Sequence, residues 1–371
     1  MTIEKVLVAG ADPMAAQIVE NCGELGINAI AFLPAAETNR PGGAAILDAA
    51  HKAGADALHP GYGDLARDLA LATAVETAGL HWIGPSPETI AHLRATDLFH
   101  ARLGALGIPM SNFKDGPDLQ GRRHIEVSLF GFADGSMVQL FDRDCSVRHP
   151  TRHIVAEAPA PHLPAGAREG MQATAIAIAK EMGLLGPGTV EFTYDRDQES
   201  FETLAFDTSP GAAFRSTEMI TGIDLIGSHI ELAAGTLEPA LQSDIETHGA
   251  ALEFRINAEI PADNFAASSG HVAACSFPDT MEGLRMETAI RAGDDISIDG
   301  ERGMATAIVR GPDRGTAIDL MVSVLENVRI EGLPTNLAFL AACVRDPVFR
   351  LSLPTTRYLA DGSYKLVGSG R

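Results

Sequence analysis

Strand-like and helix-like segments alternate at the start of the chain, and this alternation restricts the fold more than any other feature. Residues 5–9 form a short β-branched run, residues 13–25 carry apolar side chains at helical spacing, and residues 29–33 are apolar again. Strands that alternate with helices of this length pair in parallel, with the helices on the faces of the sheet. We therefore expect an α/β domain at the N-terminus.

The same unit repeats further along the chain. It predicts helices at residues 44–53 and 65–78 and strands at residues 55–58 and 81–83. Ser86 is expected to cap the next helix, with Pro87 at its first position. The turn after the first strand holds only Gly10, whereas a dinucleotide-binding fingerprint requires three glycines. This turn is therefore not expected to bind a dinucleotide.

Length and charge exclude several classes of protein. A chain of 371 residues with 46 % hydrophobic content is expected to fold into more than one lobe. The net charge of −21 disfavours binding to nucleic acid or to an anionic membrane surface. No segment is long and apolar enough for a membrane helix, so a cytoplasmic location is expected. The four cysteines form no CxxC pair and are expected to be isolated, reduced thiols.

Two N-terminal segments carry a resemblance to a known family. They are GADALHPGYG at residues 54–63 and ETAGLHWIGPSPETI at residues 76–90. Both resemble the N-terminal domain of biotin carboxylase, the ATP-grasp component of acetyl-CoA, propionyl-CoA and pyruvate carboxylases. The resemblance implies an α/β and α+β protein: an N-terminal domain with a parallel sheet, followed by an ATP-grasp and biotin carboxylase C-terminal-like lobe.

The chain departs from the family where the family has its central lid. Thr96 stands where the resemblance places a nucleotide-contacting lysine, and only residues 110–121 separate the N-terminal part from Arg122. Twelve residues cannot fold a domain, and they lack the glycine-rich composition of a loop that covers phosphates. We expect an N-terminal domain at residues 1–109, a linker at 110–121 in place of the lid, and a truncated C-terminal unit at 122–371.

The resemblance resumes at His124, which is a candidate ligand-binding residue, and continues through DRDCSVRHPTRHIVAEAPAP at residues 142–161. His153 stands where the family has a bicarbonate-contacting lysine, and a histidine cannot supply a permanent ammonium charge. His149 and His153 are four residues apart, but Pro150 disfavours a helix and no third ligand is evident. A metal site at these two histidines is not expected.

The residues expected to carry the family's reaction are mostly replaced. Glu191 remains as a candidate magnesium ligand, with a purely structural role as the alternative. Counting back without gaps from the family-like segment at residues 217–222 aligns four positions with the family's metal glutamate, metal asparagine, bicarbonate arginine and general base; these are Ala205, Asp207, Ser209 and Ala213. Of these four, only Asp207 can still bind a metal.

Arg255 is the best retained candidate for the site. It lies in residues 250–259, AALEFRINAE, where the resemblance implies an arginine that contacts biotin or bicarbonate. A structural ion pair within the C-terminal lobe is the alternative role for this side chain.

These losses predict a biotin-carboxylase-like pseudoenzyme that scaffolds or regulates a biotin-dependent carboxylase system. No cofactor is expected, and the binding of ATP, magnesium and biotin is expected to be weak or absent. The expected partners are a carboxylase subunit, a biotin carrier domain and a second copy of the chain. The alternatives are an enzyme with altered chemistry, which acts without ATP or borrows a lid in trans, and a small-molecule sensor that uses the remaining cleft.

Overall fold

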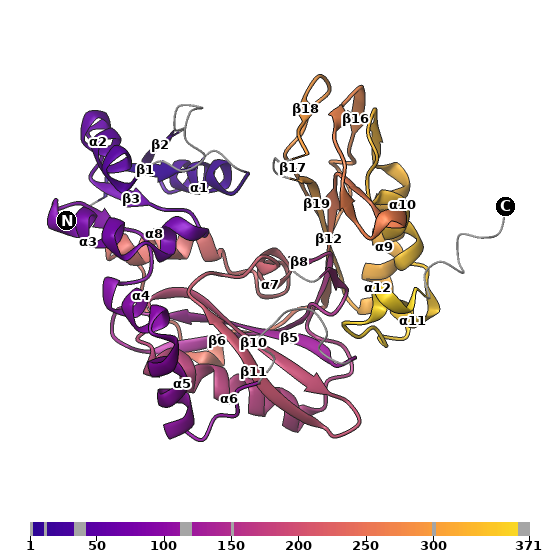
Figure 1. Ribbon diagram of the computed structural model, residues 1–371, viewed down its shortest axis with the longest axis horizontal. Helices are drawn as coiled ribbons and strands as arrows, with labels where there is room; N and C mark the ends of the chain where they lie inside the picture. Colours follow the sequence, from indigo (N-terminus) through magenta and orange to yellow (C-terminus); the bar gives the residue numbers. More distant parts are fainter. Residues whose placement is uncertain are drawn as a thin grey trace.

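The computed structural model describes residues 3–10, 13–32, 42–111, 121–149, 152–298 and 302–362. The described chain has three parts: an N-terminal α/β domain, a central antiparallel sheet with its helices, and a C-terminal lobe (Figure 1).

The N-terminal domain is built on a four-stranded parallel sheet with the strand order β2-β1-β3-β4. Its elements are β1 (Lys5–Ala9), α1 (Pro13–Glu24), β2 (Asn28–Phe32), α2 (Gly43–Ala53), β3 (Ala57–His59), η1 (Asp64–Arg67), α3 (Leu69–Thr77), β4 (His81–Trp82), α4 (Pro87–Arg94) and α5 (Thr96–Ala105). Side chains of β1 alternate between two cores, with Val6 and Val8 on the α1 side and Leu7 on the α2 and α3 side. Helices therefore cover both faces of the sheet, as expected for parallel strands.

The rest of the chain is organised on an eight-stranded antiparallel sheet with the order β11-β10-β5-β6-β9-β12-β19-β17. The elements of its central part are β5 (Arg123–Gly131), β6 (Met137–Asp144), β7 (Arg148–His149), β8 (Arg152–His153), β9 (Val155–Ala158), α6 (Ala165–Glu181), β10 (Gly186–Asp195), β11 (Ser200–Asp207), α7 (Phe214–Thr221), α8 (Leu225–Ala234) and η2 (Gln242–Asp244). Helix α6 packs on β5 and β6, where apolar side chains of the strands and helix share one core.

The C-terminal lobe continues the same sheet through β12 and β19. Its elements are β12 (Ala250–Asn257), β13 (Glu259–Ile260), η3 (Pro261–Asp263), β14 (Ala266–Ala267), β15 (Gly270–His271), β16 (Ala274–Ser276), β17 (Leu284–Thr288), β18 (Asp295–Ile296), β19 (Gly303–Gly311), α9 (Arg314–Asn327), β20 (Arg329–Glu331), α10 (Leu337–Cys343), α11 (Pro347–Arg350) and α12 (Tyr358–Asp361). Helix α9 covers β12 and β19, and its apolar side chains join the lobe's main core. One sheet thus fixes the position of the lobe relative to the central strands.

The fold class expected from the sequence is confirmed. The parallel N-terminal sheet and the antiparallel sheet that follows it are both present. Ser86 caps α4 as expected, because its Oγ accepts a hydrogen bond of 3.1 Å from the N–H of Thr89, and Pro87 opens the helix. The strand β11 was not anticipated, although it carries Ala205 and Asp207.

The chain returns from α5 to the central sheet close to β11. The N–H of Ser111 donates to the carbonyl oxygen of Thr203 at 2.8 Å, and the N–H of Thr356 donates to the carbonyl oxygen of Arg122 at 3.0 Å. Both ends of the segment that was predicted to replace the lid are therefore bonded to the body of the protein. Most of that predicted linker, residues 112–120, lies outside the described residues.

Helix α8 joins the central part to the N-terminal domain. It contacts α1, and the apolar core beneath β1 also contains Leu225, Ile226 and Ile230. A polar cluster lies at the same junction: the hydroxyl of Tyr62 lies 3.2 Å from Nδ1 of His229, and the rings of Tyr62 and His59 meet edge to face at 5.1 Å. Burial lowers the pKa of His229 to about 4 and holds the pKa of His59 well below its ordinary value. Both imidazoles are therefore neutral at neutral pH.

Among the described residues, none of the helices has the length and apolar character needed to cross a membrane.

We expect Gly131→Ala to destabilise the protein, because an added Cβ would stand 2.1 Å from the carbonyl oxygen of Leu184. A backbone oxygen cannot rotate away, and overpacking of this kind costs about 1–3 kcal/mol in free energy of unfolding. Gly104→Ala in α5 is the matched control, since nothing lies within 4 Å of its added Cβ. Urea denaturation that leaves the two variants equally stable would contradict this assignment.

We also expect acid to destabilise the domain junction through His229. Its pKa is about 4 in the folded protein against an ordinary value of 6.5, so the unfolded chain binds this proton first as the pH falls. The contribution of neutral His229 to the free energy of unfolding is fully present above pH 6.5 and is lost between pH 6.5 and 4. One proton lowers that free energy by at most about 1.4 kcal/mol per pH unit. His229→Asn should flatten the dependence of unfolding free energy on pH between 7.5 and 5. Parallel pH profiles for the variant and the parent protein would exclude this role for His229.

Candidate functional site

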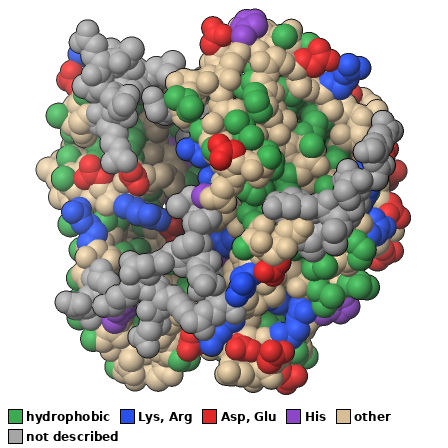
Figure 2. All heavy atoms as spheres, turned by 45° about the vertical axis from the view of Figure 1, so that its right-hand side comes forward, with side chains coloured by type: hydrophobic (Ala, Val, Ile, Leu, Met, Phe, Trp, Pro, Cys, Tyr) green, Lys and Arg blue, Asp and Glu red, His purple; other side chains and the backbone are tan. Residues whose placement is uncertain are grey.

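A cavity of about 530 Å³ lies where the three parts of the molecule meet. Strands β5, β10 and β11, the β7–β8 hairpin, the loop before α7, and strands β12, β17 and β19 supply its walls, and Tyr62 and Gly63 approach it from the N-terminal domain. Figure 2 shows basic side chains and a histidine in the hollow between the two halves of this face. Charged side chains from segments far apart in sequence therefore meet in one enclosed place.

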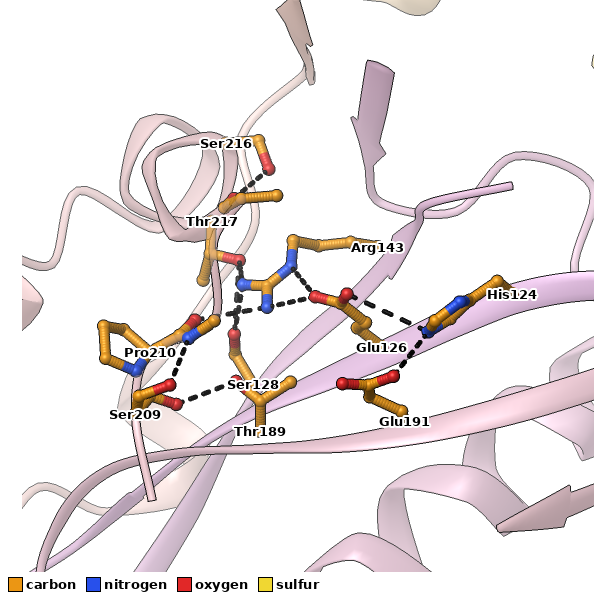
Figure 3. Close-up of polar contacts among 12 residues, drawn as sticks. His124, Glu126, Ser128, Arg143, Thr189, Glu191, Ser209, Pro210, Ser216 and Thr217 are labelled. Atoms are coloured by element: carbon orange, nitrogen blue, oxygen red, sulfur yellow. Dashed lines mark hydrogen bonds and ion pairs between the residues drawn. The ribbon is translucent and has the colours of Figure 1, made fainter. Parts of the chain in front are cut away.

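A buried arginine connects the segments that form the floor of the site. Arg143 on β6 has no exposed surface, and its guanidinium donates to Oε2 of Glu126 at 2.7 Å, to Oγ1 of Thr217 at 2.9 Å and to the carbonyl oxygen of Pro210 at 3.2 Å (Figure 3). These contacts connect β5, α7 and the loop between β11 and α7. At Gly211 the chain passes so close that a Cβ would stand 2.6 Å from Nη2 of Arg143.

His124 is positioned by an arginine on one side and a carboxylate on the other. Arg148 contacts Nδ1 of His124. Nε2 of His124 lies 3.1 Å from Oε2 of Glu191 (Figure 3). Because a guanidinium can only donate, Nδ1 accepts and the ring proton lies on Nε2, which donates to Glu191. Burial raises the pKa of Glu191, and the Arg148 guanidinium opposes that effect. Both ring nitrogens of His124 are therefore occupied, Nδ1 by Arg148 and Nε2 by Glu191.

His153 and Arg255 line another wall of the cavity together. His153 is 6 % exposed, its Nε2 has no hydrogen-bond partner among the described residues, and burial lowers its pKa to about 3, with Arg255 as the next cause. Strand β12 fixes the backbone of Arg255, which donates from N to the carbonyl oxygen of Ile154 at 3.0 Å. Within the described part of the chain, no carboxylate lies within ion-pair distance of Arg255. An uncompensated guanidinium beside a neutral imidazole can hold a small anion.

The two candidate metal ligands lie on adjacent strands. The register places Ala205 opposite Glu191 and Asp207 opposite Thr189, so Asp207 is a diagonal neighbour of Glu191. Both carboxylates line the cavity, and two carboxylates are a donor set that suits a divalent cation together with phosphate oxygens. Ala205, directly across from Glu191, contributes no ligand. Asp207 forms an ion pair with Arg67 of the N-terminal domain.

Ser209, Ala213 and Thr96, the other substituted positions, differ in where they lie. Ser209 lines the cavity, and its Oγ accepts from the N–H of Gly211 at 3.3 Å. Ala213 has no exposed surface and packs with Cys145 and Ala156, away from the cavity lining. Thr96 begins α5, and its side chain lies outside the described part of the structure.

Two groups of side chains have the composition of a metal site. In one, Glu126, Cys145 and His153 offer ligand atoms within 4.8 Å of one another; in the other, His124, Glu126 and Glu191 do. Glu126 is held by Arg143, and burial raises the pKa of the Cys145 thiol. Glu126 and Cys145 are therefore engaged or protonated, and a cation at Glu191 and Asp207 would have to displace His124 and Arg67 from them. His149 belongs to neither of these groups of described residues.

Several side chains of the site were missed from the sequence. Glu126, Arg143, Arg148 and Arg152 lie within or next to the recognised motifs, but the substitutions drew attention instead. The feature that could have indicated the three arginines is the concentration of basic residues between Arg143 and His153 in an acidic chain. Nothing in the sequence indicated Glu287 or Arg67 as residues of the site. Only folding brings Glu287 of β17 to Arg215 and Arg67 of η1 to Asp207.

We expect Arg143→Met to lower the free energy of unfolding by about 3–5 kcal/mol, since it leaves the Glu126 carboxylate buried without its partner. Glu126→Gln combined with Arg143→Met should cost less than Arg143→Met alone, because the unpaired charge is then removed. Arg291→Met, at a side chain 90 % exposed, is the control and should change stability little. Chemical denaturation tests this, and a double variant no more stable than the single one would refute it.

Three family models match the chain in sequence order. Residues 41–90 match the biotin carboxylase N-terminal domain, residues 117–240 the ATP binding domain of the carbamoyl-phosphate synthase L chain, and residues 253–361 the biotin carboxylase C-terminal domain. Biotin carboxylase 2 of Bacillus subtilis is 29 % identical over 440 aligned positions, covering 96 % of this chain and 98 % of the relative. This chain has only 371 residues, so at least 69 of the 440 aligned positions (440 minus 371) have no counterpart in it.

Longer relatives and solved structures agree with this match. The alpha subunit of methylcrotonoyl-CoA carboxylase from Dictyostelium discoideum is 28 % identical over 94 % of this chain, which spans 62 % of that subunit's length. The biotin carboxylase domain of the Hydrogenobacter thermophilus 2-oxoglutarate carboxylase, a dimer solved with MgADP, ADP and bicarbonate, has a TM-score of 0.90. It is 26 % identical to this chain, and the match covers 98 % of this chain and 99 % of that one.

One expectation from the sequence is corrected by these matches. The prediction that no cofactor is bound, and that ATP, magnesium and biotin bind weakly or not at all, is wrong, because the ATP-binding domain is present at residues 117–240. That prediction gave decisive weight to the expectation that the phosphate loop is absent and that the reacting side chains are replaced. The domain also depends on β5, β10 and β11, which still present His124, Glu191 and Asp207 to the cavity. The three family matches, in the family's order and on its fold, show that the chain belongs to the biotin carboxylase family.

Proposed function

We propose that this protein binds ligands in a biotin carboxylase cleft without itself driving the ATP-dependent carboxylation of biotin. In this proposal it acts as a regulatory or scaffolding partner of a biotin-dependent carboxylase system. The observation that carries the proposal is the state of the acidic side chains in the cavity, since bicarbonate activation requires a base that is free to take a proton.

Each acidic side chain that lines the cavity in the described structure is already engaged. Glu126 pairs with Arg143, Asp207 with Arg67, Glu287 with Arg215, and Glu191 accepts from His124. A carboxylate held by a cation must give up its ion pair to take a proton, and this opposes the rise in pKa that burial causes at Glu191 and Asp207.

The position that the resemblance assigns to the general base is also without a basic group. Ala213 stands there, buried against Cys145 and Ala156. His153 has a free ring nitrogen, but a pKa of about 3 makes it a poor base near neutral pH. The loss of a positioned base alone typically lowers the rate by about 10²–10⁴.

Ligand binding is supported by the cations that remain. Arg255 faces the cavity without a carboxylate partner among the described residues, while Arg152, which pairs with Glu259, and Arg148 line the same space. A bicarbonate ion or another small carboxylate satisfies this arrangement, because a guanidinium offers parallel donors to two oxygen atoms. Nucleotide binding follows from the matched ATP-binding domain.

The proposed partners are a biotin carrier domain, a carboxylase subunit and a second copy of this chain. The relatives support them: the Dictyostelium protein is a subunit of a carboxylase, and the Hydrogenobacter domain is described as a dimer. The proposed arrangement keeps residues 1–109 and 122–371 as separate units of one scaffold, with residues 110–121 in place of the lid.

A second function is favoured by one observation. Buried His153, whose Nε2 has no hydrogen-bond partner among the described residues, lines the same cavity as Arg255. A biotin-dependent enzyme that handles carboxybiotin without ATP, or that receives a lid in trans, would use this pair to hold the carboxyl group.

We expect no bicarbonate-dependent release of phosphate when the protein is given ATP, Mg²⁺, bicarbonate and free biotin. Titration calorimetry on the same preparation should detect binding of ADP to the protein. Bicarbonate binding should weaken at least roughly tenfold in Arg255→Ala, as expected for the loss of a charge-assisted contact, and should be unchanged in the exposed control Arg291→Ala. Bicarbonate-dependent phosphate release that disappears in Arg255→Ala would contradict the proposal and favour the second function.

The partner is tested by affinity purification of the full chain from its native host, followed by detection of biotinylated proteins with streptavidin. Recovery of a biotin-carrying carboxylase component supports the scaffold role. Recovery of none, from a preparation in which the chain remains folded, counts against it.

A further inference from the structure

Arg67 brings a positive charge from the N-terminal domain to the metal side of the cavity. It ends η1, the short turn that follows the His59–Gly63 loop, and its guanidinium pairs with Asp207 at the end of β11. The residues are 140 positions apart in sequence. The ion pair therefore joins the N-terminal domain to β11 at a residue that lines the cavity.

The turn that carries Arg67 is fixed at its next residue. The side chain of Asp68 caps α3 by accepting from the N–H groups of Ala70 at 3.0 Å and Leu71 at 3.1 Å. The Arg67 side chain itself is 56 % exposed, whereas Asp207 is 25 % exposed. The arginine can therefore leave the pair for solvent without burying an unpaired charge, while Asp207 stays in the cavity wall.

The guanidinium acts on both candidate metal ligands. Burial raises the pKa of Asp207 and of Glu191, and Arg67 opposes the rise at each of them. Ala205, opposite Glu191, supplies no further carboxylate, so Asp207 is the one carboxylate that β11 offers to the cavity among the described residues. A divalent cation at this place and the Arg67 guanidinium need the same oxygen atoms.

We propose that Arg67 is a tethered cation that competes with a divalent metal ion for Asp207, so that metal binding opens the contact between the N-terminal domain and β11. This goes beyond the proposed function and rests on it only in requiring that the cleft accept a metal. The competition makes metal affinity a reporter of the position of the N-terminal domain. By reciprocity, whatever separates that domain from β11 raises the affinity for the metal.

The test measures Mn²⁺ binding to the full chain by the electron paramagnetic resonance signal of free Mn²⁺. Arg67→Gln should bind Mn²⁺ more tightly than the parent protein, on the order of tenfold. Arg102→Gln is the matched control, since it also removes one positive charge and one ion pair, with Glu181 at 3.4 Å, away from the cavity. It should bind Mn²⁺ as the parent protein does, and thermal melting verifies that each variant is folded.

Asp207→Asn supplies the second arm. It should weaken Mn²⁺ binding, and adding Arg67→Gln to it should no longer raise the affinity. Equal affinities in Arg67→Gln and the parent protein, equal gains in Arg67→Gln and Arg102→Gln, or a full gain in the double variant would each overturn the proposal. The proposed function has a separate readout: bicarbonate-dependent phosphate release would refute that function and leave the competition at Asp207 standing.

Discussion

The buried ion pair between Arg143 and Glu126 is the interaction on which the candidate site depends. Burying two charges is costly unless each finds partners, and Arg143 meets this demand by bonding to β5, α7 and the Pro210 carbonyl at once. The loop between β11 and α7 is thereby drawn against β6, and Gly211 permits the close approach. In this position of the loop, Ser209 lines the cavity and Ala213 packs in the core with Cys145 and Ala156.

The same principle of paired charge determines what the cavity can do. Its acidic side chains are matched by Arg143, Arg67 and Arg215 or by His124, which leaves little free base, while Arg255 remains available to an anion. In the proposed function, binding and chemistry are therefore separated at the level of single side chains: positive charge in the cleft holds a ligand, and the acidic groups that line the cavity in the described structure are already engaged.

The fold was largely predictable from the sequence, whereas the state of the site was not. The alternation of strand-like and helix-like segments predicted β1 at Lys5–Ala9 with the observed bounds, and its helix at residues 44–53 begins one residue after the start of α2 at Gly43–Ala53. Strand β11 was missed because attention fell on the side chains that were expected to be replaced and not on the polar and apolar pattern around them; its register places Ala205 opposite Glu191.

The partners of the retained residues depend on contacts between distant segments. The pair between Arg67 and Asp207 follows from the approach of the N-terminal domain to β11, and the neutral state of His153 follows from burial beside Arg255. The most direct test of the central claim is the transfer of ¹⁴C from labelled bicarbonate to a biotinylated carrier domain in the presence of Mg²⁺ and ATP, with an active biotin carboxylase as the positive control. We predict that the full chain alone transfers no label above background although it binds ADP, and label that accumulates with time and requires ATP would contradict this account.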